Sequence, residues 1–295
     1  MTIRNLDRIF APRTVAVIGA SGRPGSVGRS VLQNLQSASN LKLFPVNPKH
    51  GQLDGLQCWP SLAALPVNPD LAVICTPAAT VPALVEECGG AKVGGLVILT
   101  AGFGEIGSAG KAMEDQVRQA AAKFPEMRIL GPNCLGFMAP HRDLNASFVD
   151  QLPPRGNVAF ISQSGALCSA ILDWSAAENV GFSYFISLGN MLDIGVADLL
   201  DYLAEDPWTK SVVLYLESVT EARRFMSAAR GLSRNKPIIA YKAGRFAESA
   251  KAAASRHLRT AHLPRTLRGS RRQFRTRQPD RGAARDHEPR RPAHR

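Results

Sequence analysis

Glycine recurs at every third position between residues 19 and 28, directly after a short apolar run. The run, Val15 to Ile18, is typical of a buried parallel strand. The glycines are Gly19, Gly22, Gly25 and Gly28, with Ser21, Ser26 and Val27 among the residues between them. Val27, Val31 and Leu35 have helical spacing, so a helix is predicted to begin near Ser26. This layout can bind a phosphate, because bare backbone lets the ligand approach and free NH groups point at it.

The spacing of these glycines matches neither the G-x-G-x-x-G dinucleotide fingerprint nor a phosphate loop that ends in Lys-Ser/Thr. We therefore expect a nucleotide-like ligand bound to an open α/β sheet. A purely structural tight turn is the alternative. The loop by itself does not specify which nucleotide binds.

Strands and helices alternate from residue 15 to about residue 150. The expected strands cover 15–18, 41–46, 71–75, 95–100 and 128–130. Helices are indicated by the spacing of Val81, Leu84, Val85 and Cys88, and by that of Met113, Val117 and Phe124. Such alternation predicts an α/β fold with parallel strands and right-handed helical crossovers, a Rossmann-like sheet. Ligands of such sheets bind at the carboxyl ends of the strands.

The segment after the second strand distinguishes between nucleotide classes. Proteins that bind NAD usually place an acid here, for the ribose hydroxyls. Residues 45–50 read PVNPKH, with Lys49 and no acid. Lys49 suits a phosphorylated ribose, and an ordinary exposed loop lysine is the alternative. Small or rigid residues follow the next three strands and leave room for a ligand: Thr76 and Pro77, Thr100, and Asn133.

A second α/β unit is expected after a proline-rich linker at 141–156. Its strands cover 157–161, 182–187, 212–216 and 237–241, with helices near 195–204 and 220–232. The first strand runs into Ser162, Gln163, Ser164 and Gly165, where a helix N-terminus can hold an anion. A plain serine N-cap is the alternative. Glu217 ends the third strand, either on the ligand edge or as a solvated acid.

Several short motifs occur in order between residues 6 and 255. They read LDRIFAPRTVAVIGAS, PVNPK, CTPA, AGFGE, LGPNCLG, SQSGA, YLES and KPIIAYKAGR. With these motifs the chain resembles the NDP-forming acyl-CoA synthetases, which include ADP-forming acetate–CoA ligase and the α subunit of succinyl-CoA synthetase. The resemblance implies a Rossmann-like CoA-binding domain over 1–140 and an incomplete flavodoxin-like domain over 157–255.

The resemblance also implies a cofactor and a reaction. Coenzyme A is expected on the loop from Ser21 to Gly28 with Lys49, Thr76, Pro77, Thr100 and Asn133. Its ribose 3′-phosphate agrees with a lysine after the second strand. In the family a histidine of the second domain carries a phosphoryl group between ADP or ATP and an acyl phosphate, a form of covalent catalysis. The SQSGA loop matches the loop that cradles this phosphate, and Glu217 matches the acid that orients the phosphohistidine.

The match to the motifs of the family stops at Ser255. The family's histidine lies in Ser-His-Thr-Gly just after the K-A-G-R segment, but this chain reads Ser255-Arg256-His257-Leu258. His257 is one place late, so it is either a displaced catalytic candidate or an accidental neighbour. We therefore expect a CoA-binding protein whose acyl-CoA synthesis is impaired. ADP or ATP with Mg²⁺ would require a partner ATP-grasp chain, and a homo-oligomer is the other expected assembly.

Residues 256–295 differ in composition from the rest of the chain. They hold 13 arginines, no lysine and three acids, a net charge of +10, whereas residues 1–255 carry +2. Such a segment cannot bury enough apolar surface to offset its ordering entropy. We interpret it as a disordered, out-of-frame continuation of the reading frame. The alternative is a genuine basic tail for nucleic acid or an acidic partner, although Phe274 is its single aromatic residue.

The cysteine spacing and the hydropathy of the chain narrow the classes of protein to which it can belong. Five separated cysteines (Cys58, Cys75, Cys88, Cys134 and Cys168) form no C-x-x-C pair, which favours free thiols in a reducing cytoplasm and predicts no metal site. No apolar run approaches the roughly 20 residues of a membrane helix, and residues 1–13 lack the pattern of a secretory signal. The alternative functions are an NADP-dependent oxidoreductase and a non-enzymatic CoA-binding protein with a basic tail.

Overall fold

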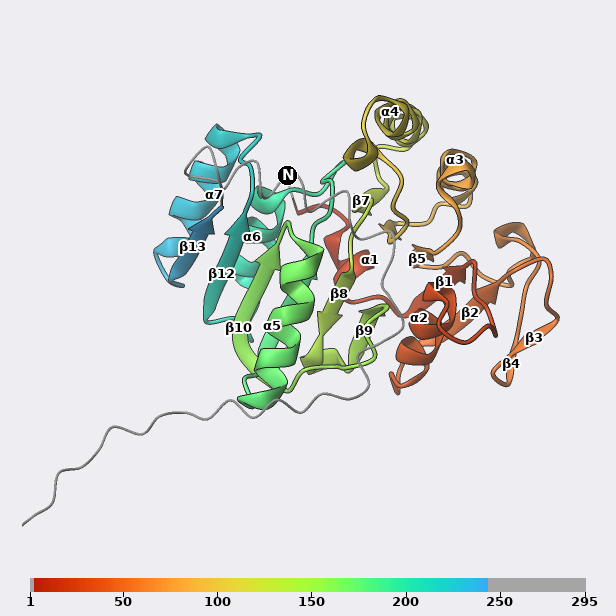
Figure 1. Ribbon diagram of the computed structural model, residues 1–295, viewed down its shortest axis with the longest axis horizontal. Coiled ribbons are helices and arrows are strands. Elements are labelled where there is room, and N and C mark those ends of the chain that lie inside the picture. Colours follow the sequence, from red (N-terminus) through yellow and green to blue (C-terminus); the bar gives the residue numbers. More distant parts are fainter. Residues whose placement is uncertain (1–2, 244–295) are drawn as a thin grey trace, which may run out of the picture. The chain divides into compact units, whose positions relative to one another are not determined.

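The computed structural model describes residues 3–243, and Figure 1 shows two sheets within them. The first sheet is parallel, with strand order β2-β1-β5-β6-β7. Its strands are β1 (Thr14–Ile18), β2 (Lys42–Val46), β5 (Leu71–Ile74), β6 (Gly95–Ile98) and β7 (Arg128–Leu130). A short hairpin of β3 (Gln52–Leu53) and β4 (Leu56–Gln57) follows β2. The predicted Rossmann-like parallel sheet is confirmed.

Helices cover both faces of this first sheet, which explains why its strands read as continuous apolar runs. The helices are α1 (Leu6–Phe10), α2 (Val27–Gln36), α3 (Val81–Gly90) and α4 (Ser108–Ala122). Ala16 and Ile18 share a buried cluster with Val85 of α3 and Val117 of α4. Val15 and Val17 point to the opposite face and share a cluster with α1 and α2. Phe124, which the spacing assigned to a helix, lies just beyond α4 and packs against that cluster.

The second sheet combines parallel and antiparallel strands in the order β13-β12-β10-β11-β8-β9. Its parallel strands are β10 (Arg155–Ser162), β11 (Phe182–Ser187), β12 (Ser211–Leu216) and β13 (Ile238–Lys242). Its helices are α5 (Gly165–Ala177), α6 (Val196–Glu205) and α7 (Ala222–Ser233). Figure 1 shows α5 lying over β10. This sheet is the flavodoxin-like unit expected from the sequence.

The antiparallel strands β8 (Gly136–Ala139) and β9 (Leu144–Ser147) were not foreseen. The proline-rich pattern predicts a linker over 141–156, yet β9 lies in this range and pairs with β8, which pairs with β11. Every residue of β8 and β9 is buried. Polar residues interrupt the apolar pattern of β9, so the sequence does not predict this strand. Within it, Ser147 Oγ donates to Asn145 Oδ1 at 2.7 Å, so these side chains satisfy each other in the interior.

One of the hydrophobic clusters contains residues of both sheets. Phe10 of α1 lies with its ring centroid 5.0 Å from that of Phe137 on β8 and 5.3 Å from that of Tyr202 on α6. On its other side α1 contacts β6, where a Cβ at Gly95 would lie 2.3 Å from Ile9. The helix therefore packs between the sheets. Across residues 3–243, no helix has both the length and the apolar character that a bilayer span requires.

Candidate functional site

The glycine loop leads from β1 into α2, whose N-cap residue is Ser26. The Ser26 side chain makes no capping hydrogen bond to this helix, and its Oγ donates to the Arg23 carbonyl at 2.7 Å. The NH groups of Val27 and Gly28 have no acceptor within residues 3–243. A Cβ at Gly28 would lie 2.0 Å from the Gly19 carbonyl oxygen, so glycine is needed for this close approach. The loop thus offers backbone donors suited to a phosphate.

The end of β1 is tied to the ends of both neighbouring strands. The Gly19 NH donates to the Val46 carbonyl at 2.9 Å, and the Cys75 NH donates to the Ile18 carbonyl at 2.9 Å. Asn47 Nδ2 also donates to the Ala20 carbonyl at 2.7 Å. Because β2 and β5 lie on opposite sides of β1, the chain changes direction here. Open α/β sheets bind their ligands at this kind of switch point.

Hydrogen bonds continue along the same edge through three of the predicted site residues. Thr100 Oγ1 donates to the Thr76 carbonyl at 2.7 Å. The Asn133 NH donates to the Thr100 carbonyl at 2.9 Å. Pro77 is exposed beside Thr76. The structure therefore brings the residues after β5, β6 and β7 into one contiguous row that begins at the glycine loop.

Lys49 is exposed after β2, and its NH donates to Asn47 Oδ1 at 2.9 Å. Arg29 donates through its guanidinium to the Gly22 carbonyl, which places a second cation beside the loop. Residues 19–29 and 45–50 include no acid. This corner of the sheet therefore combines cations with backbone donors, a chemistry that favours an anionic ligand.

The second sheet has a comparable junction between β10 and α5. Ser164 Oγ accepts the Leu167 NH at 3.4 Å, so the N-cap alternative for this serine is observed. Ser162 Oγ accepts the Ser164 NH at 3.0 Å, and Gly165 begins α5. Both hydroxyls thus shape the loop itself. The loop ends at a helix N-terminus, where the helix dipole favours negative charge.

Gln163 ties this loop to the end of β12. Its Oε1 accepts the Glu217 NH at 2.6 Å and the Ser218 NH at 2.9 Å, and its Nε2 donates to the Ser218 carbonyl at 2.9 Å. Because β12 and β11 lie on opposite sides of β10, this is the switch point of the second sheet. Glu217 is half-buried there. The structure thus brings Ser162, Gln163, Ser164 and Gly165 together with Glu217 at one edge.

Two residues at these edges were missed in the sequence. Lys242 ends β13, and its Nζ donates to the Glu217 carbonyl at 2.8 Å. Asn190 follows β11, and its Oδ1 accepts from Asn133 Nδ2 at 3.2 Å. Lys242 is the last residue of β13, and Asn190 lies in the loop that follows β11. The rule that strand ends carry ligand residues, applied to every strand, would have found them.

Two of the cysteines lie near the first edge but are not suited to nucleophilic chemistry. Burial raises the pKa of the Cys75 thiol to about 12, and that of Cys134 to about 12. Such thiols stay protonated near neutral pH. Residues 3–243 also hold no cluster of three or more His, Cys, Asp or Glu suited to a metal ion. The catalytic candidate His257 lies outside the described residues.

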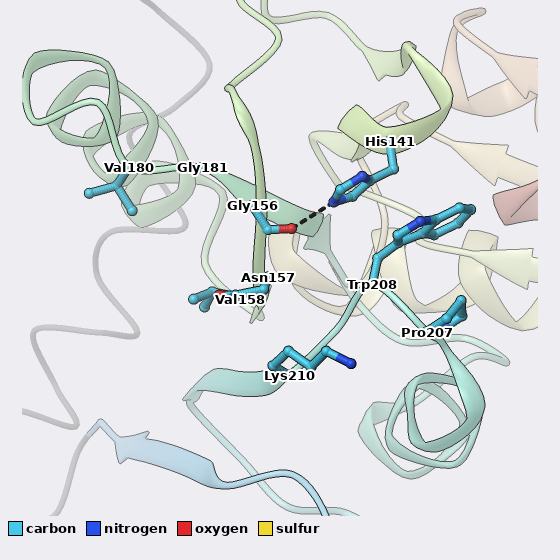
Figure 2. A pocket seen from close by; sticks show the side chains of 9 residues that line it. All are labelled: His141, Gly156, Asn157, Val158, Val180, Gly181, Pro207, Trp208 and Lys210. Atoms are coloured by element: carbon cyan, nitrogen blue, oxygen red, sulfur yellow. Dashed lines mark hydrogen bonds between the residues drawn. The ribbon is translucent and has the colours of Figure 1, made fainter.

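Two hollows of the described surface lie away from both edges. One of about 550 Å³ lies at the amino ends of β10, β11 and β12 (Figure 2). There the His141 ring stacks on Trp208 with centroids 5.2 Å apart, and its Nε2 lies 2.7 Å from the Gly156 carbonyl oxygen. Another, of about 670 Å³, runs along α7. Neither is lined by a predicted site residue, and the first is at the opposite strand ends from Ser162, so we assign neither to the site.

Comparison with known families identifies both halves of the chain. Residues 13–140 match the CoA binding domain family. Residues 155–274 match the family described as the succinyl-CoA ligase like flavodoxin domain. The second match continues past Ser255, beyond the described residues.

Characterised relatives align with most of the chain. The alpha subunit of ADP-forming acetate–CoA ligase II from Pyrococcus furiosus is 44% identical over 250 residues, which cover 85% of this chain and 54% of the relative. The ADP-forming acetate–CoA ligase of Methanocaldococcus jannaschii is 45% identical over 250 residues, 85% of this chain and 35% of the relative. The chain thus spans about half or less of the length of these two relatives.

A solved structure extends the comparison to three dimensions. It is the dinucleotide-forming acetyl-coenzyme A synthetase 1 of Candidatus Korarchaeum cryptofilum in complex with phosphate and ADP. The TM-score is 0.80 at 40% sequence identity, over 85% of this chain and 54% of that one. The fold similarity therefore includes both sheets.

Proposed function

This chain belongs to the NDP-forming acyl-CoA synthetases, and from this premise we propose that the row of residues along its first sheet edge binds coenzyme A. The observation that carries the proposal is the contiguity of that row. Asn47 contacts Ala20, Thr100 contacts Thr76, and Asn133 contacts Thr100. An extended ligand can lie along such a row at the carboxyl ends of the strands.

The chemistry of the row fits coenzyme A. The NH groups of Val27 and Gly28 are suited to the diphosphate, since a helix N-terminus favours anions. Lys49, at a position where NAD-binding proteins carry an acid, is suited to the ribose 3′-phosphate. Thr76, Pro77 and Thr100 follow β5 and β6, on the other side of the glycine loop from Lys49, and leave space for the rest of the ligand. When bound, coenzyme A supplies the thiol that carries an acyl group.

Calorimetric titration with coenzyme A and with NADPH tests this assignment. We expect coenzyme A to bind and NADPH to bind more weakly, because the two ligands differ in the position of the ribose phosphate and in the rest of the molecule. Tighter binding of NADPH, or its oxidation in the presence of a carbonyl substrate, would favour the oxidoreductase alternative.

For the second edge we propose phosphate binding by Ser162, Gln163, Ser164 and Gly165, with Glu217 beside them. Glu217 would orient a phosphohistidine, as its counterpart does in the family. Because Ser255 is followed by Arg256 and His257 rather than by His-Thr-Gly, we propose that phosphoryl transfer is impaired in this chain. ADP, ATP and Mg²⁺ would be handled by a separate ATP-grasp chain, in keeping with a relative named as an alpha subunit.

Acetyl phosphate tests the impairment without that partner chain. We expect no phosphohistidine in the chain as it stands, measured by intact mass and by acid lability. A variant with Arg256→His, His257→Thr and Leu258→Gly restores the family motif and is expected to gain about 80 Da. Phosphorylation of the unaltered chain at His257 would contradict the impairment.

We also propose an origin for residues 256–295 and a cellular compartment for the protein. Residues 256–295 lie outside the described residues, and we propose that they are read out of frame. A reading frame in the gene that encodes His-Thr-Gly after Ser255 would support this origin, and its absence would contradict it. The five free cysteines suit a reducing compartment, and we propose the cytoplasm.

A further inference from the structure

One loop of five residues, Leu188 to Leu192, is hydrogen-bonded to both sheet edges. We refer to residues 188–192 as the bridging loop. At its start the Leu188 NH donates to the Ser162 carbonyl at 2.8 Å, in the junction after β10. Further along, the Asn190 NH donates to the Pro132 carbonyl at 2.8 Å, and the Leu192 NH donates to the Gly131 carbonyl at 3.0 Å. The backbone of this loop therefore connects the two candidate edges directly.

The bridging loop lies in tight contact with the first edge. A Cβ at Gly189 would lie 2.1 Å from the Pro132 carbonyl oxygen and 2.7 Å from that of Asn133. Gly189 also has a φ of +60°, which a side chain disfavours. The next residue, Asn190, is therefore held in place by backbone contacts. Its side chain starts from a position that the fold defines.

The Asn190 side chain has a partner on each of its polar atoms. Nδ2 donates to Glu105 Oε2 at 2.8 Å and to Glu114 Oε2 at 2.8 Å. Oδ1 accepts from Asn133 Nδ2 at 3.2 Å. An amide suits this place, because it donates through nitrogen and accepts through oxygen. An aspartate would put a third carboxylate beside Glu105 and Glu114.

These contacts extend into the loop after β6. The other oxygen of Glu105, Oε1, accepts the NH groups of Gly102 and Phe103. Burial alone would raise the pKa of Glu105, but the hydrogen bonds from Asn190 and from these NH groups outweigh it and lower the pKa. Glu105 is therefore held as a carboxylate that fixes residues 102–105. Asn190 is therefore hydrogen-bonded both to this loop, through Glu105, and to Asn133.

The residue after Asn190 contacts the second edge. Met191 Sδ accepts from Gln163 Nε2 at 3.3 Å, and Gln163 in turn binds the NH groups of Glu217 and Ser218. A displacement of the bridging loop at Asn190 would therefore also move one of the two acceptors of Gln163 Nε2, the other being the Ser218 carbonyl. Adjacent residues of one loop thus contact the proposed CoA row and the proposed phosphate loop.

We propose that Asn190 is a positioning residue that couples the CoA-binding edge of the first sheet to the phosphate-binding edge of the second. The inference rests on the proposed function, since it assumes a ligand at the first edge. Asn190 would hold Asn133 and Glu105 in their binding positions. Through Met191 it would set the position of Gln163, and with it the loop that begins at Ser162.

Hydrogen–deuterium exchange of the full chain, with and without coenzyme A, tests the coupling. In the unaltered chain we expect coenzyme A to slow exchange in residues 19–28 and also in residues 162–168. In Asn190→Ala we expect protection of 19–28 to persist and protection of 162–168 to disappear. Binding should weaken about tenfold, as for the loss of a hydrogen bond to a charged group.

Asn34→Ala is the matched control. Asn34 is also an asparagine that links the two halves, since its Nδ2 donates to the Ser147 carbonyl at 2.8 Å and to that of Val149 at 2.9 Å. It contacts neither edge. We expect this variant to keep the protection of residues 162–168, and thermal melting shows whether each variant is folded. Loss of that protection in Asn34→Ala as well would overturn the specific role of Asn190.

A charge swap separates positioning from a general loss of stability. Asn190→Asp should lose binding and coupling, because it places like charges together. In the double variant Asn190→Asp with Glu105→Gln, the new amide can donate to the new carboxylate, so we expect partial recovery of both. This pair also carries the test if Asn190→Ala does not fold. No recovery in the double variant would overturn the proposal.

The outcomes separate this inference from the proposed function. If the unaltered chain binds coenzyme A with protection at 19–28 but none at 162–168, the coupling is wrong and the CoA assignment stands. If Asn190→Ala keeps protection at 162–168, the coupling is also wrong. If the folded, unaltered chain shows no binding of coenzyme A, the proposed function fails and the coupling falls with it.

Discussion

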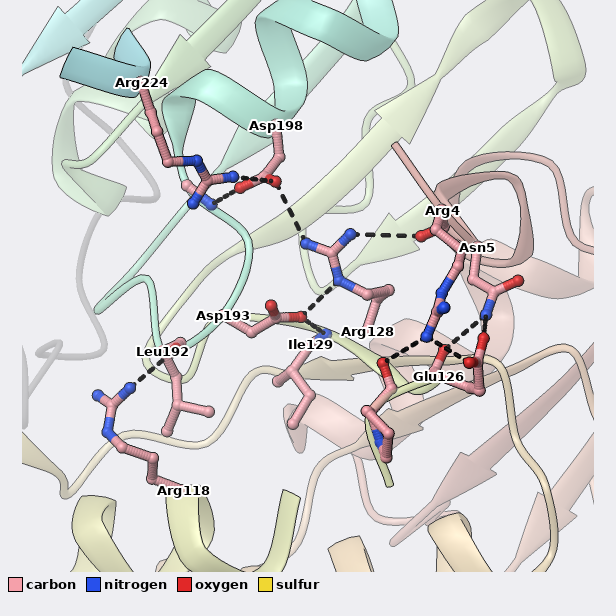
Figure 3. Close-up of polar contacts among 12 residues, drawn as sticks. Arg4, Asn5, Arg118, Glu126, Arg128, Ile129, Leu192, Asp193, Asp198 and Arg224 are labelled. Atoms are coloured by element: carbon pink, nitrogen blue, oxygen red, sulfur yellow. Dashed lines mark hydrogen bonds and ion pairs between the residues drawn. The ribbon is translucent and has the colours of Figure 1, made fainter. Parts of the chain in front are cut away.

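Arg128 and Asp198 form an ion pair across the two halves of the chain, and both are withdrawn from solvent. The Arg128 guanidinium lies 3.4 Å from Asp198 Oδ1, with side-chain exposures of 11% and 2%. Figure 3 shows that Arg128 also reaches Asp193, at 2.9 Å, while Arg224 approaches Asp198 from the other side. These contacts hold β7 of the first sheet against the start of α6. They lie next to the bridging loop, since Asp193 directly follows Leu192.

Removal of Arg128 should therefore destabilise the protein. Arg128→Ala leaves the buried carboxylate of Asp198 with fewer partners, and we expect a loss of about 2–4 kcal/mol of unfolding free energy. Lys123→Ala is the control, because the Lys123–Glu86 pair has exposures of 59% and 50%, and its loss should cost under about 1 kcal/mol. Urea unfolding measures both. Equal effects of the two substitutions would contradict the structural role of Arg128.

Asp70 should contribute stability that depends on pH. Burial alone would raise its pKa, but the NH groups of Arg13 and Thr14, the Thr14 hydroxyl and Arg8 outweigh burial and lower it from the ordinary 3.8. A carboxyl with a lowered folded pKa stabilises fully above its unfolded pKa. This contribution is lost as the pH falls through the lower folded value.

Asp70→Asn measures this contribution. At pH 7 we expect a loss of about 1–3 kcal/mol, because the charge-assisted hydrogen bonds weaken. The difference from the unaltered chain should shrink below about pH 4. Asp115→Asn, on an exposed position of α4, is the control for removing one negative charge. Urea unfolding at several pH values measures this difference in unfolding free energy. A difference that does not change with pH would contradict the lowered pKa of Asp70.

The five thiols should be unreactive in the folded protein. Burial raises the pKa of Cys75, Cys134 and Cys168 to about 12 and also raises the pKa of Cys58 and Cys88. With a pKa of about 12, only about one thiol in 10⁴ is ionised at pH 8. We expect little alkylation by iodoacetamide until urea is added, when five labels should appear in the mass spectrum. Rapid labelling of Cys75 or Cys134 in the folded chain would contradict the burial of these two thiols.

Much of the first sheet could be predicted from the sequence, because its strands are buried on both faces. Short apolar runs such as Val15 to Ile18 and Leu71 to Ile74 are typical of buried strands, because helices are usually longer. The strand β9 could not be found, because Asn145 and Ser147 interrupt the apolar pattern and their mutual hydrogen bond forms only in the fold. Local patterns carry no information on such pairs.

The candidate site likewise contains some residues that could be predicted from the sequence and one that could not. Thr76, Thr100 and Asn133 were predicted because each ends or follows a predicted strand, and parallel strands end at one edge. Asn190 was missed although it follows a strand too, since its partners Glu105 and Glu114 are 85 and 76 residues away in the chain. Its sequence neighbourhood, Leu-Gly-Asn-Met, is ordinary. Only the packing of one sheet against the other brings this amide to its partners.

We propose that the first edge binds coenzyme A with Lys49 at the 3′-phosphate. The most direct test is a calorimetric titration of the full chain with coenzyme A and with dephospho-CoA, repeated for Lys49→Ala and Lys42→Ala. Lys42 is the matched control, because it is exposed at the opposite end of β2. We predict that the unaltered chain and Lys42→Ala prefer coenzyme A by about tenfold, and that Lys49→Ala loses this preference. Equal affinity of the unaltered chain for the two ligands, or no binding of either by folded protein, would contradict the account.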